Sequence, residues 1–308
     1  MRTSIRSRVV GAVLLALALV VGACGDDDGS GGDLKEGPTI KVGSTNFGEQ
    51  LILGEIYAQV LEANGYSVER QFNLGSREIV NPALKNGEID LLAEYTGALL
   101  TFEGGTATTD SEETHTALQQ AIADDGLVAL DYAPAQDKDG LVVTAETAGS
   151  LGLATISDLA EHDEDLVLGG PPECPDREFC LIGYRDVYGL EFEDFVPLDV
   201  GGPLTVAALD GGDIDVGVLF TSDGVIAARN FVLLEDDMNL HPAQNIVPVI
   251  RQEILDAYGD ELVDLLNRVS AEITTAELSE LNKRYGIDAE DADILARDWL
   301  IDQGFLSA

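Results

Sequence analysis

Basic residues are scarce in this chain of 308 residues. Only 17 lysines and arginines stand against 57 aspartates and glutamates, so the formal net charge is −40. A protein that binds nucleic acid needs a basic footprint for the phosphates, and the charge balance excludes that class. It also excludes an anionic membrane surface as the working partner. We interpret the acidic excess as a solvated surface that keeps the protein soluble, with a cleft potential that recruits a cation as the alternative.

Motifs of catalysis and cofactor binding are missing as well. The sequence has no phosphate-binding loop, no GxGxxG after a predicted strand and no GxSxG elbow. Its three histidines, His115, His162 and His241, lie outside any spacing typical of a metal site. Carboxylate pairs are too common in so acidic a chain to single one out. We therefore expect no enzymatic activity, no metal and no cofactor.

The N-terminus indicates export. Three arginines precede the apolar run VVGAVLLALALVVGA, which ends directly before Cys24. This order is typical of a secretory signal, and the run is shorter than the roughly 20 residues of a comfortable membrane span, although an uncleaved anchor is the alternative. The residues VGAC resemble the lipobox of bacterial lipoproteins. We predict a signal peptide over 1–23 and a lipid on Cys24, which would hold the protein on the outer face of the cytoplasmic membrane. Residues 24–37 are Gly/Asp/Ser-rich and are predicted to form a flexible tether.

Cysteine is rare, and two of the three cysteines lie close together. Cys174 and Cys180 fall in the segment PPECPDREFC. Because the chain is predicted to be exported, we expect them to form a disulfide, with two free thiols or a metal site as the alternatives. Such a disulfide would clamp a proline-containing loop locally rather than close a large one.

One helix–turn–strand unit occurs twice. The segment 83–96, ALKNGEIDLLAEYT, returns without a gap as 208–221, ALDGGDIDVGVLFT. Each copy predicts the end of a helix, a glycine stop and a short apolar strand that ends in an aromatic residue, Tyr95 or Phe220, followed by threonine. Ligands of open α/β sheets bind outside the carboxyl ends of strands. The repeat therefore predicts two similar α/β domains that face a shared cleft, although the unit could serve packing alone.

The loop 44–47 is a candidate ligand contact. It joins a predicted strand over 39–44 to a predicted helix over 49–64, which Thr45 or Asn46 is expected to cap. Free backbone N–H groups at such a helix start suit an anionic or hydrogen-bonding ligand group. Phe47 is expected to contact the ligand in the cleft, and the alternative is that it forms a hydrophobic staple at the start of the helix.

Strands and helices alternate up to residue 251, and only helices are predicted from 252 to 305. These helices are expected to pack back on the first domain. We predict domain I over 38–140 and 243–308 and domain II over 141–242. Further strands are expected over 67–74, 127–130, 141–144, 166–168, 231–234 and 245–251, with helices over 110–125, after a Ser157 cap, and near 184–188.

Four segments carry a family resemblance: IKVGSTNFGEQ, NLGSREI, GEIDLLAEYTG and LFTSDG. They resemble the substrate-binding lipoproteins of osmoprotectant ABC importers, which bind glycine betaine, carnitine or choline. The segments LGGPPE and PAQDKD resemble the actinobacterial, ProX-like branch. The resemblance covers nearly all of residues 38–308. It implies a type II periplasmic-binding-protein fold, with two α/β domains, a ligand cleft between them and a two-strand hinge. It also implies a monomer that delivers its ligand to a permease and an ATPase.

In this family a cage of aromatic rings holds a trimethylammonium group by cation–π contact. Tyr95 matches one cage tyrosine, and Phe220 matches another as phenylalanine. Two other cage positions fall on Asp139 and Val206, which are not aromatic.

The carboxylate side of the family site also departs from the pattern. Thr45 stands where the family often has a lysine, Ala98 replaces a threonine, and Arg177 matches the family's carboxylate-binding arginine. Asp137 and Asp139 favour a cation without a carboxylate, such as choline, or hydrogen bonds to a polyol. The predicted ligand-binding residues are Thr45, Asn46, Phe47, Tyr95, Thr96, Gln136, Asp137, Asp139, Arg177, Phe220, Thr221 and Asp223.

Two alternative functions stay open at this point. One is the same fold and transport role with a sugar, polyol or aromatic ligand, which the missing cage residues motivate. The other is a surface interaction protein that uses the fold without transport.

Overall fold

The computed structural model describes residues 34–308, and the predicted signal peptide and Cys24 lie outside the described residues. Residues 34–37, which the prediction places in the tether, form neither helix nor strand. Lys35 nevertheless donates its backbone N–H to Gly65 O at 2.7 Å and its ammonium to Glu261 at 2.7 Å. Within residues 34–308, no helix combines the length and the apolar character needed to cross a membrane.

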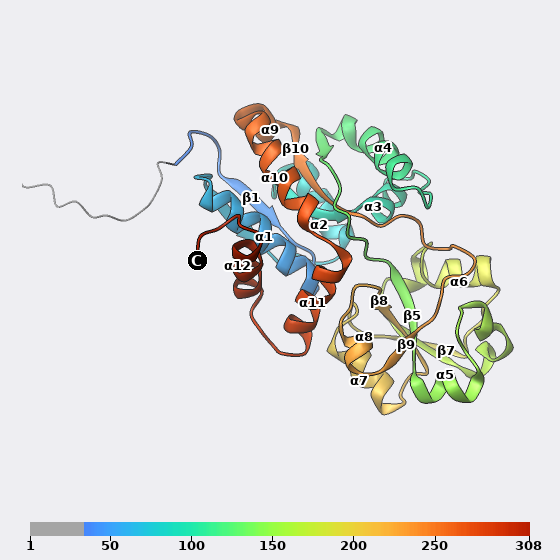
Figure 1. Cartoon of the computed structure of the whole chain (residues 1–308). Helices are drawn as coiled ribbons and strands as arrows, with labels where there is room; N and C mark the ends of the chain where they lie inside the picture. The colour runs from blue at the N-terminus through green and yellow to red at the C-terminus, as the bar shows by residue number, and fades with distance from the viewer. Residues whose placement is uncertain (1–33) are drawn as a thin grey trace, which may run out of the picture. The chain divides into compact units, whose positions relative to one another are not determined.

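Two five-stranded mixed sheets organise the described chain (Figure 1). The strand order of the first is β2-β1-β3-β10-β4, and only β10 runs antiparallel to its neighbours. Its strands are β1 (Ile40–Gly43), β2 (Val68–Gln71), β3 (Leu91–Tyr95), β4 (Leu127–Ala129) and β10 (Ile246–Arg251). We call this sheet with the helices packed on it the first lobe.

The second sheet repeats the same plan in the order β7-β6-β8-β5-β9, with β5 antiparallel to both neighbours. Its strands are β5 (Asp139–Thr144), β6 (Val167–Gly170), β7 (Asp194–Pro197), β8 (Val216–Phe220) and β9 (Phe231–Leu233). We call this sheet with its helices the second lobe. The prediction of two similar α/β units is confirmed.

The repeated unit forms the centre of each sheet. Helix α2 (Arg77–Asn86) ends at Gly87 with φ 75°, and helix α7 (Pro203–Gly211) ends at Gly212 with φ 71°. This left-handed conformation suits glycine because it has no Cβ. The chain then enters β3 in the first lobe and β8 in the second. Both strands are the middle strand of their sheet, so their carboxyl ends occupy equivalent places.

The C-terminal helices belong to the first lobe, as predicted. They are α9 (Gln252–Tyr258), α10 (Asp260–Glu272), α11 (Thr275–Gly286) and α12 (Ala292–Asp302). Leu266, Leu278 and Leu295 join Ile56 of α1 (Gly48–Ala63) in one core with the first sheet. Figure 1 shows α12 alongside α1. Helix α1 is apolar on most of its surface because it is enclosed between the sheet and these helices.

The remaining helices flank the two sheets. They are α3 (Thr96–Phe102), α4 (Ser111–Ile122), α5 (Ala145–Leu151), α6 (Leu181–Tyr188) and α8 (Val225–Ala228). Short 3₁₀ helices cover Ala123–Asp125, Ser157–Glu161, Asp163–Asp165 and Cys174–Asp176. Helices α3, α5 and α8 were not predicted, although a Thr144 side-chain cap and a stop at Gly152 bound α5.

Two predicted helix caps are wrong. Helix α1 begins at Gly48, so its N-cap is Phe47, which makes no side-chain cap bond. Thr45 and Asn46 precede the N-cap position, whereas a capping side chain has to stand at that position to bond the first turn. Ser157 is likewise the first residue of its 3₁₀ helix rather than its cap.

The chain passes between the lobes twice, and the two crossing segments pair with each other. Gln136 and Asn245 form an isolated antiparallel bridge. The Asp137 N–H donates to Gln244 O at 3.1 Å, and the Ile246 N–H donates to Ala135 O at 3.1 Å. This pairing is the two-strand hinge that the resemblance implies.

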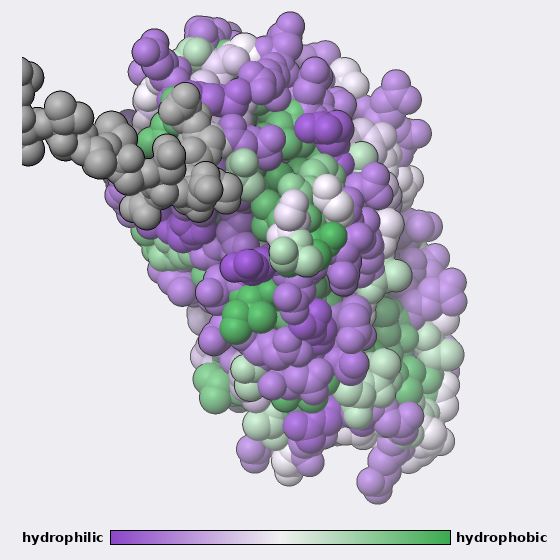
Figure 2. Space-filling model, turned by 60° about the vertical axis from the view of Figure 1, so that its left-hand side comes forward, coloured by the Kyte–Doolittle hydropathy of each residue, from purple (hydrophilic) through white to green (hydrophobic). Residues whose placement is uncertain are grey.

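The face in Figure 2 is mostly hydrophilic, and apolar residues form separate small patches on it. Such a surface agrees with the interpretation of the acidic excess as a solvated exterior.

Candidate functional site

A cavity of about 730 Å³ is lined by residues of both lobes. The first lobe contributes the loop after β1, the start of α2 and the end of β3. The second lobe contributes the disulfide loop 171–180, Val200 and Phe220 at the end of β8. The cavity therefore lies where the carboxyl ends of the central strands meet, as the repeat predicts.

Three of the five aromatic rings that line this cavity pack together. The Phe47 ring centroid lies 5.0 Å from that of Phe220, with an angle of 30° between the planes. It lies 6.3 Å from the Tyr95 centroid, in a stacked arrangement at 25°. The faces of such rings carry negative electrostatic potential and attract cations. Phe47 therefore belongs to the cavity, where it connects a ring from each repeat copy.

The Tyr95 hydroxyl is held in place by the start of α1. It donates to Glu49 Oε1 at 2.5 Å and accepts from Gln50 Nε2 at 3.4 Å. Burial raises the pKa of Tyr95 well above its ordinary value, and the charge of Glu49 raises it further. The phenol is therefore neutral at physiological pH and acts as a hydrogen-bond donor.

Three polar atoms of residues that line the cavity are buried and have no hydrogen-bond partner within the described protein. They are Thr45 Oγ1, Gln50 Oε1 and Thr101 Oγ1. A buried polar atom without a partner is costly, because its interaction with water is lost and not replaced. A ligand hydroxyl in the cavity could donate to one of these oxygens, whereas a quaternary ammonium group has no N–H to donate.

The cavity lining is strongly acidic, with seven acidic and two basic side chains. Both basic side chains already have acidic partners. Arg77 donates to both carboxylate oxygens of Glu94, at 2.8–3.1 Å. Arg177 of the second lobe donates to Glu78 of the first lobe at 2.6 Å. A ligand carboxylate would have to displace one of these partners, whereas a cation would not.

Cys174 and Cys180 form a disulfide with a sequence separation of 6, and both are buried in the second-lobe core. The disulfide closes the loop that carries Arg177, so it holds this side chain at the cavity.

Replacing both cysteines with serine is expected to lower the free energy of unfolding by about 2 kcal/mol, because the unfolded chain regains the entropy of a short closed loop. Urea unfolding with and without a reductant measures the effect. The reductant should shift the midpoint of the parent protein but not that of the double variant. A parent midpoint that is insensitive to reduction would contradict the prediction.

The structure brings eight of the twelve predicted ligand-binding residues to the cavity and places four elsewhere. The eight that line it are Thr45, Asn46, Phe47, Tyr95, Asp137, Asp139, Arg177 and Phe220. Those outside its lining are Thr96, Gln136, Thr221 and Asp223.

Hydrogen bonds explain why those four side chains lie elsewhere. Thr96 Oγ1 donates to Ala243 O and accepts from the Asn245 N–H, so this side chain binds the second crossing segment of the hinge. Gln136 Oε1 accepts from the Gln244 N–H in the same crossing. Thr221 Oγ1 accepts from the Lys138 N–H.

Asp223 accepts from the Val225 N–H at the start of α8. Burial raises the pKa of Asp223 to about 6, and the charge of Glu49 adds to the shift. Val206, which matches a cage position of the family, packs in the second-lobe core and does not line the cavity.

The prediction missed several polar residues of the cavity. Gln50 follows Phe47 by one turn in the segment STNFGEQ, and Arg77 and Glu78 lie in NLGSREI. Both segments carry the family resemblance, so their charged and amide residues were available as candidates. Glu94 was equally visible, directly before Tyr95 in the repeated strand.

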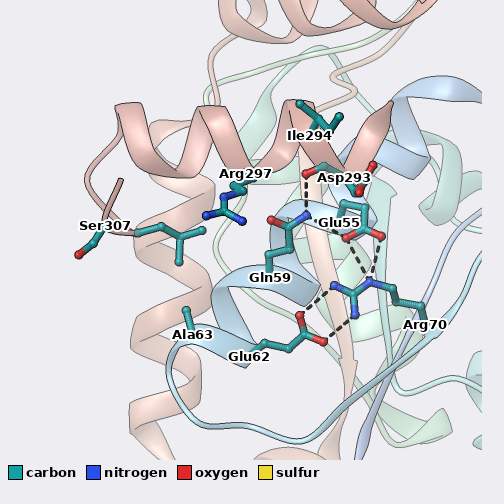
Figure 3. Close-up of a pocket in the computed structure, with 10 residues that line it drawn as sticks. Glu55, Gln59, Glu62, Ala63, Arg70, Asp293, Ile294, Arg297 and Ser307 are labelled. Atoms are coloured by element: carbon teal, nitrogen blue, oxygen red, sulfur yellow. Dashed lines mark hydrogen bonds and ion pairs between the residues drawn. The ribbon is translucent and has the colours of Figure 1, made fainter. Parts of the chain in front are cut away.

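A second hollow, of about 590 Å³, lies on the first lobe between α1 and α12 (Figure 3). Arg70 is bound there by Glu55 and Glu62, and Gln59 donates to Glu55 and to Asp293 O. This hollow has no aromatic lining, and its hydrogen bonds are largely internal. The cavity between the lobes is therefore the better candidate for ligand binding.

Two α/β lobes, a two-strand hinge and a cavity lined from both sides define a type II periplasmic binding protein. The family model described as "Substrate binding domain of ABC-type glycine betaine transport system" matches residues 38–302, and the chain belongs to this family. The main functional prediction is thereby confirmed: the chain is the substrate-binding component of a glycine betaine/carnitine/choline-type ABC transport system.

Three similar proteins illustrate the family. The glycine-betaine-binding protein of Pseudomonas aeruginosa is 28% identical over 87% of this chain and 88% of its own length. The carnitine transport binding protein OpuCC of Listeria monocytogenes is 28% identical over 94% of this chain and 93% of its own length. A crystal structure of a glycine betaine/carnitine/choline ABC transporter matches with a TM-score of 0.71 and 26% identity, covering 86% of this chain and 99% of that one. Members of this family bind solutes outside the cytoplasm for a permease and an ATPase, and are not enzymes.

Proposed function

We propose that the protein captures a quaternary ammonium cation in the cavity between its lobes and that it prefers a cation without a carboxylate, such as choline, to a zwitterion such as glycine betaine. The observation that carries the proposal is the ring cluster of Phe47, Tyr95 and Phe220 within an acidic lining. The rings supply cation–π attraction to a methylated ammonium group, which is worth about 0.5–2 kcal/mol for each desolvated contact.

The preference for a simple cation rests on charge. Asp139 lines the cavity at a position that matches an aromatic cage residue in the family, and its carboxylate makes no hydrogen bond to the described residues. Arg177 is paired with Glu78, so a betaine carboxylate has to replace that partner. A hydroxyl group such as that of choline can instead donate to Gln50 Oε1, which has no partner within the described protein.

The remaining parts of the proposal concern the setting of the protein. Cleavage before Cys24 and lipidation of that cysteine would anchor a monomer to the outer face of the cytoplasmic membrane. Domain I would comprise residues 38–140 and 243–308, and domain II residues 141–242. The permease and ATPase would receive the ligand from the cavity, and the membrane would be contacted only through the lipid.

A thermal-shift panel on the soluble chain that starts after Cys24 tests the ligand class. Choline, glycine betaine, carnitine, proline betaine, ectoine and trehalose form the panel. A ligand at 100 times its dissociation constant should stabilise the protein by about 2.7 kcal/mol. We expect shifts with the quaternary amines and the tightest binding with choline. A shift with a sugar or polyol alone would refute the quaternary-amine assignment, and tighter binding of glycine betaine would refute only the charge preference.

A further inference from the structure

A buried chain of polar groups connects the two lobes beneath the ring cluster. Ser222, in the loop after β8 of the second lobe, lies 2.7 Å from Glu49 Oε2 of α1 in the first lobe. The same Ser222 hydroxyl lies 2.7 Å from Asp137 Oδ1 of the crossing segment. Asn282 of α11 donates to Glu49 Oε2 at 2.7 Å. Glu49, Asp137 and Ser222 are 4%, 5% and 0% exposed, so water cannot replace these partners.

If Glu49 and Asp137 are both ionised, the contacts of Ser222 need one more hydrogen than these groups carry. A serine hydroxyl carries one hydrogen, and an ionised carboxylate only accepts hydrogen bonds. The Ser222 hydroxyl can therefore donate to Glu49 or to Asp137, but not fully to both. At 2.7 Å the other contact would bring two oxygens together with no hydrogen between them. The contact becomes a hydrogen bond when that carboxyl group is protonated and donates to Ser222 Oγ.

We infer that Glu49 and Asp137 share one proton through Ser222, and that this proton-holding pair is a positioning site which joins the two lobes and orients the Tyr95 ring for the ligand. Glu49 connects this pair to Tyr95, because its second oxygen accepts a hydrogen bond from the Tyr95 hydroxyl. The orientation of Tyr95 for a ligand rests on the function proposed above, whereas the shared proton does not.

The charges around the pair favour its protonation. The pKa of Glu49 is raised by burial, and the pKa of Asp137 is raised by burial and then by the charge of Glu49. Asp139, at the start of β5, and Asp223, beside Ser222, are further acids that act on the pair. The remaining neighbours are neutral or already paired: the Tyr95 phenol, the amides of Gln50 and Asn282, and Arg77, which is held by Glu94.

The sign of the pH effect follows from linkage. The unfolded chain releases the proton above the ordinary carboxyl pKa values of 4.5 for glutamate and 3.8 for aspartate. The folded pair keeps its proton to higher pH. Between those values and the raised pKa of the pair, the folded state binds more protons, so stability falls as the pH rises. One shared proton changes the unfolding equilibrium constant by up to about tenfold for each pH unit.

The decisive variant is Glu49→Gln. Its amide oxygen keeps the Tyr95 bond, its amide nitrogen donates to Ser222 Oγ, and Asn282 can turn its own amide to accept. Ser222 then donates to Asp137, so the variant imitates the protonated pair at every pH. Urea unfolding of ligand-free protein is measured from pH 5 to 8. With each unit of rising pH, the unfolding equilibrium constant of the parent should increase by up to about tenfold relative to that of the variant.

Two further variants keep the test decisive. Asp137→Asn removes the other carboxylate and should show the same pH-dependent gain if Glu49→Gln fails to fold. The matched control is Glu55→Gln, on the same helix, which removes a buried partner of Arg70 outside the cavity and should destabilise at every pH. A constant difference between Glu49→Gln and the parent across this pH range would refute the shared proton.

The unfolding experiment does not depend on the ligand. If no quaternary amine binds, the proposed ligand is wrong, and the unfolding experiment still decides the shared proton.

Discussion

Replacing Glu94 with glutamine is expected to lower the free energy of unfolding by about 3–5 kcal/mol, because it leaves the Arg77 guanidinium buried without its counter-ion. The Glu94 side chain is 2% exposed and that of Arg77 is 13% exposed. Arg77 donates to both carboxylate oxygens of Glu94 at distances of 2.8–3.1 Å. Urea unfolding monitored by circular dichroism measures the loss.

Two controls separate the buried charge from the loss of a hydrogen bond. Glu280→Gln breaks an exposed pair with Lys283, whose side chain is 41% accessible, and should cost less than about 1 kcal/mol. The double variant Arg77→Met with Glu94→Leu removes both charges and should recover much of the loss. A loss below 1 kcal/mol for Glu94→Gln would show that water reaches Arg77 and that the pair is not buried in solution.

Replacing Phe47 with alanine is expected to weaken choline binding by about 10- to 100-fold, because this ring packs against the rings of both Tyr95 and Phe220 in the cavity. Phe47→Tyr keeps the ring face and should retain most of the affinity. Isothermal titration calorimetry at constant ionic strength gives the dissociation constants.

The matched control is Phe305→Ala. Phe305 stacks on Trp299 at a centroid distance of 6.3 Å, comparable to the Phe47–Tyr95 pair, but it lies in the C-terminal part of the first lobe and does not line the cavity. It should lower stability and leave choline affinity unchanged. Equal affinities of Phe47→Ala and the parent would remove the ring cluster from the ligand site.

Phe47 suits this experiment better than Tyr95. Tyr95 is only 7% exposed, belongs to the first-lobe core and bonds Glu49 and Gln50. Its truncation therefore costs stability as well as affinity, since it leaves a cavity and an unpartnered carboxylate oxygen. From the sequence alone Tyr95 looks like a free cleft residue, because the apolar strand pattern does not tell how deeply its last residue is buried.

The helix–glycine–strand unit was predictable because its signals are local. Glycine at a helix stop and alternation of apolar segments depend on neighbours within a few residues. The failed cap at Thr45 or Asn46 was a local error of one or two positions. The missed helix α5 is short, and its alanine, glycine and threonine residues give no clear apolar face.

The division of the predicted site residues has a different cause. Thr96 and Thr221 follow Tyr95 and Phe220 directly in the repeat, yet their side chains bond crossing segments that lie far away in the sequence. Because successive residues at a strand end point in different directions, one of each pair faces the cavity and the other the hinge. No spacing within the repeat distinguishes the two.

The sequence by itself determined the two α/β units, the helical C-terminus and the family, because these follow from local pattern and from segments that match in order. Only the tertiary structure decided which polar groups meet. The groups that meet come from four distant segments: Glu49, Asp137, Ser222 and Asn282. With 57 carboxylates in the sequence, no spacing indicates which two come into contact. Whether two carboxylates share a proton depends on a contact of a few ångströms and on exclusion of water, and both arise only when the segments pack together.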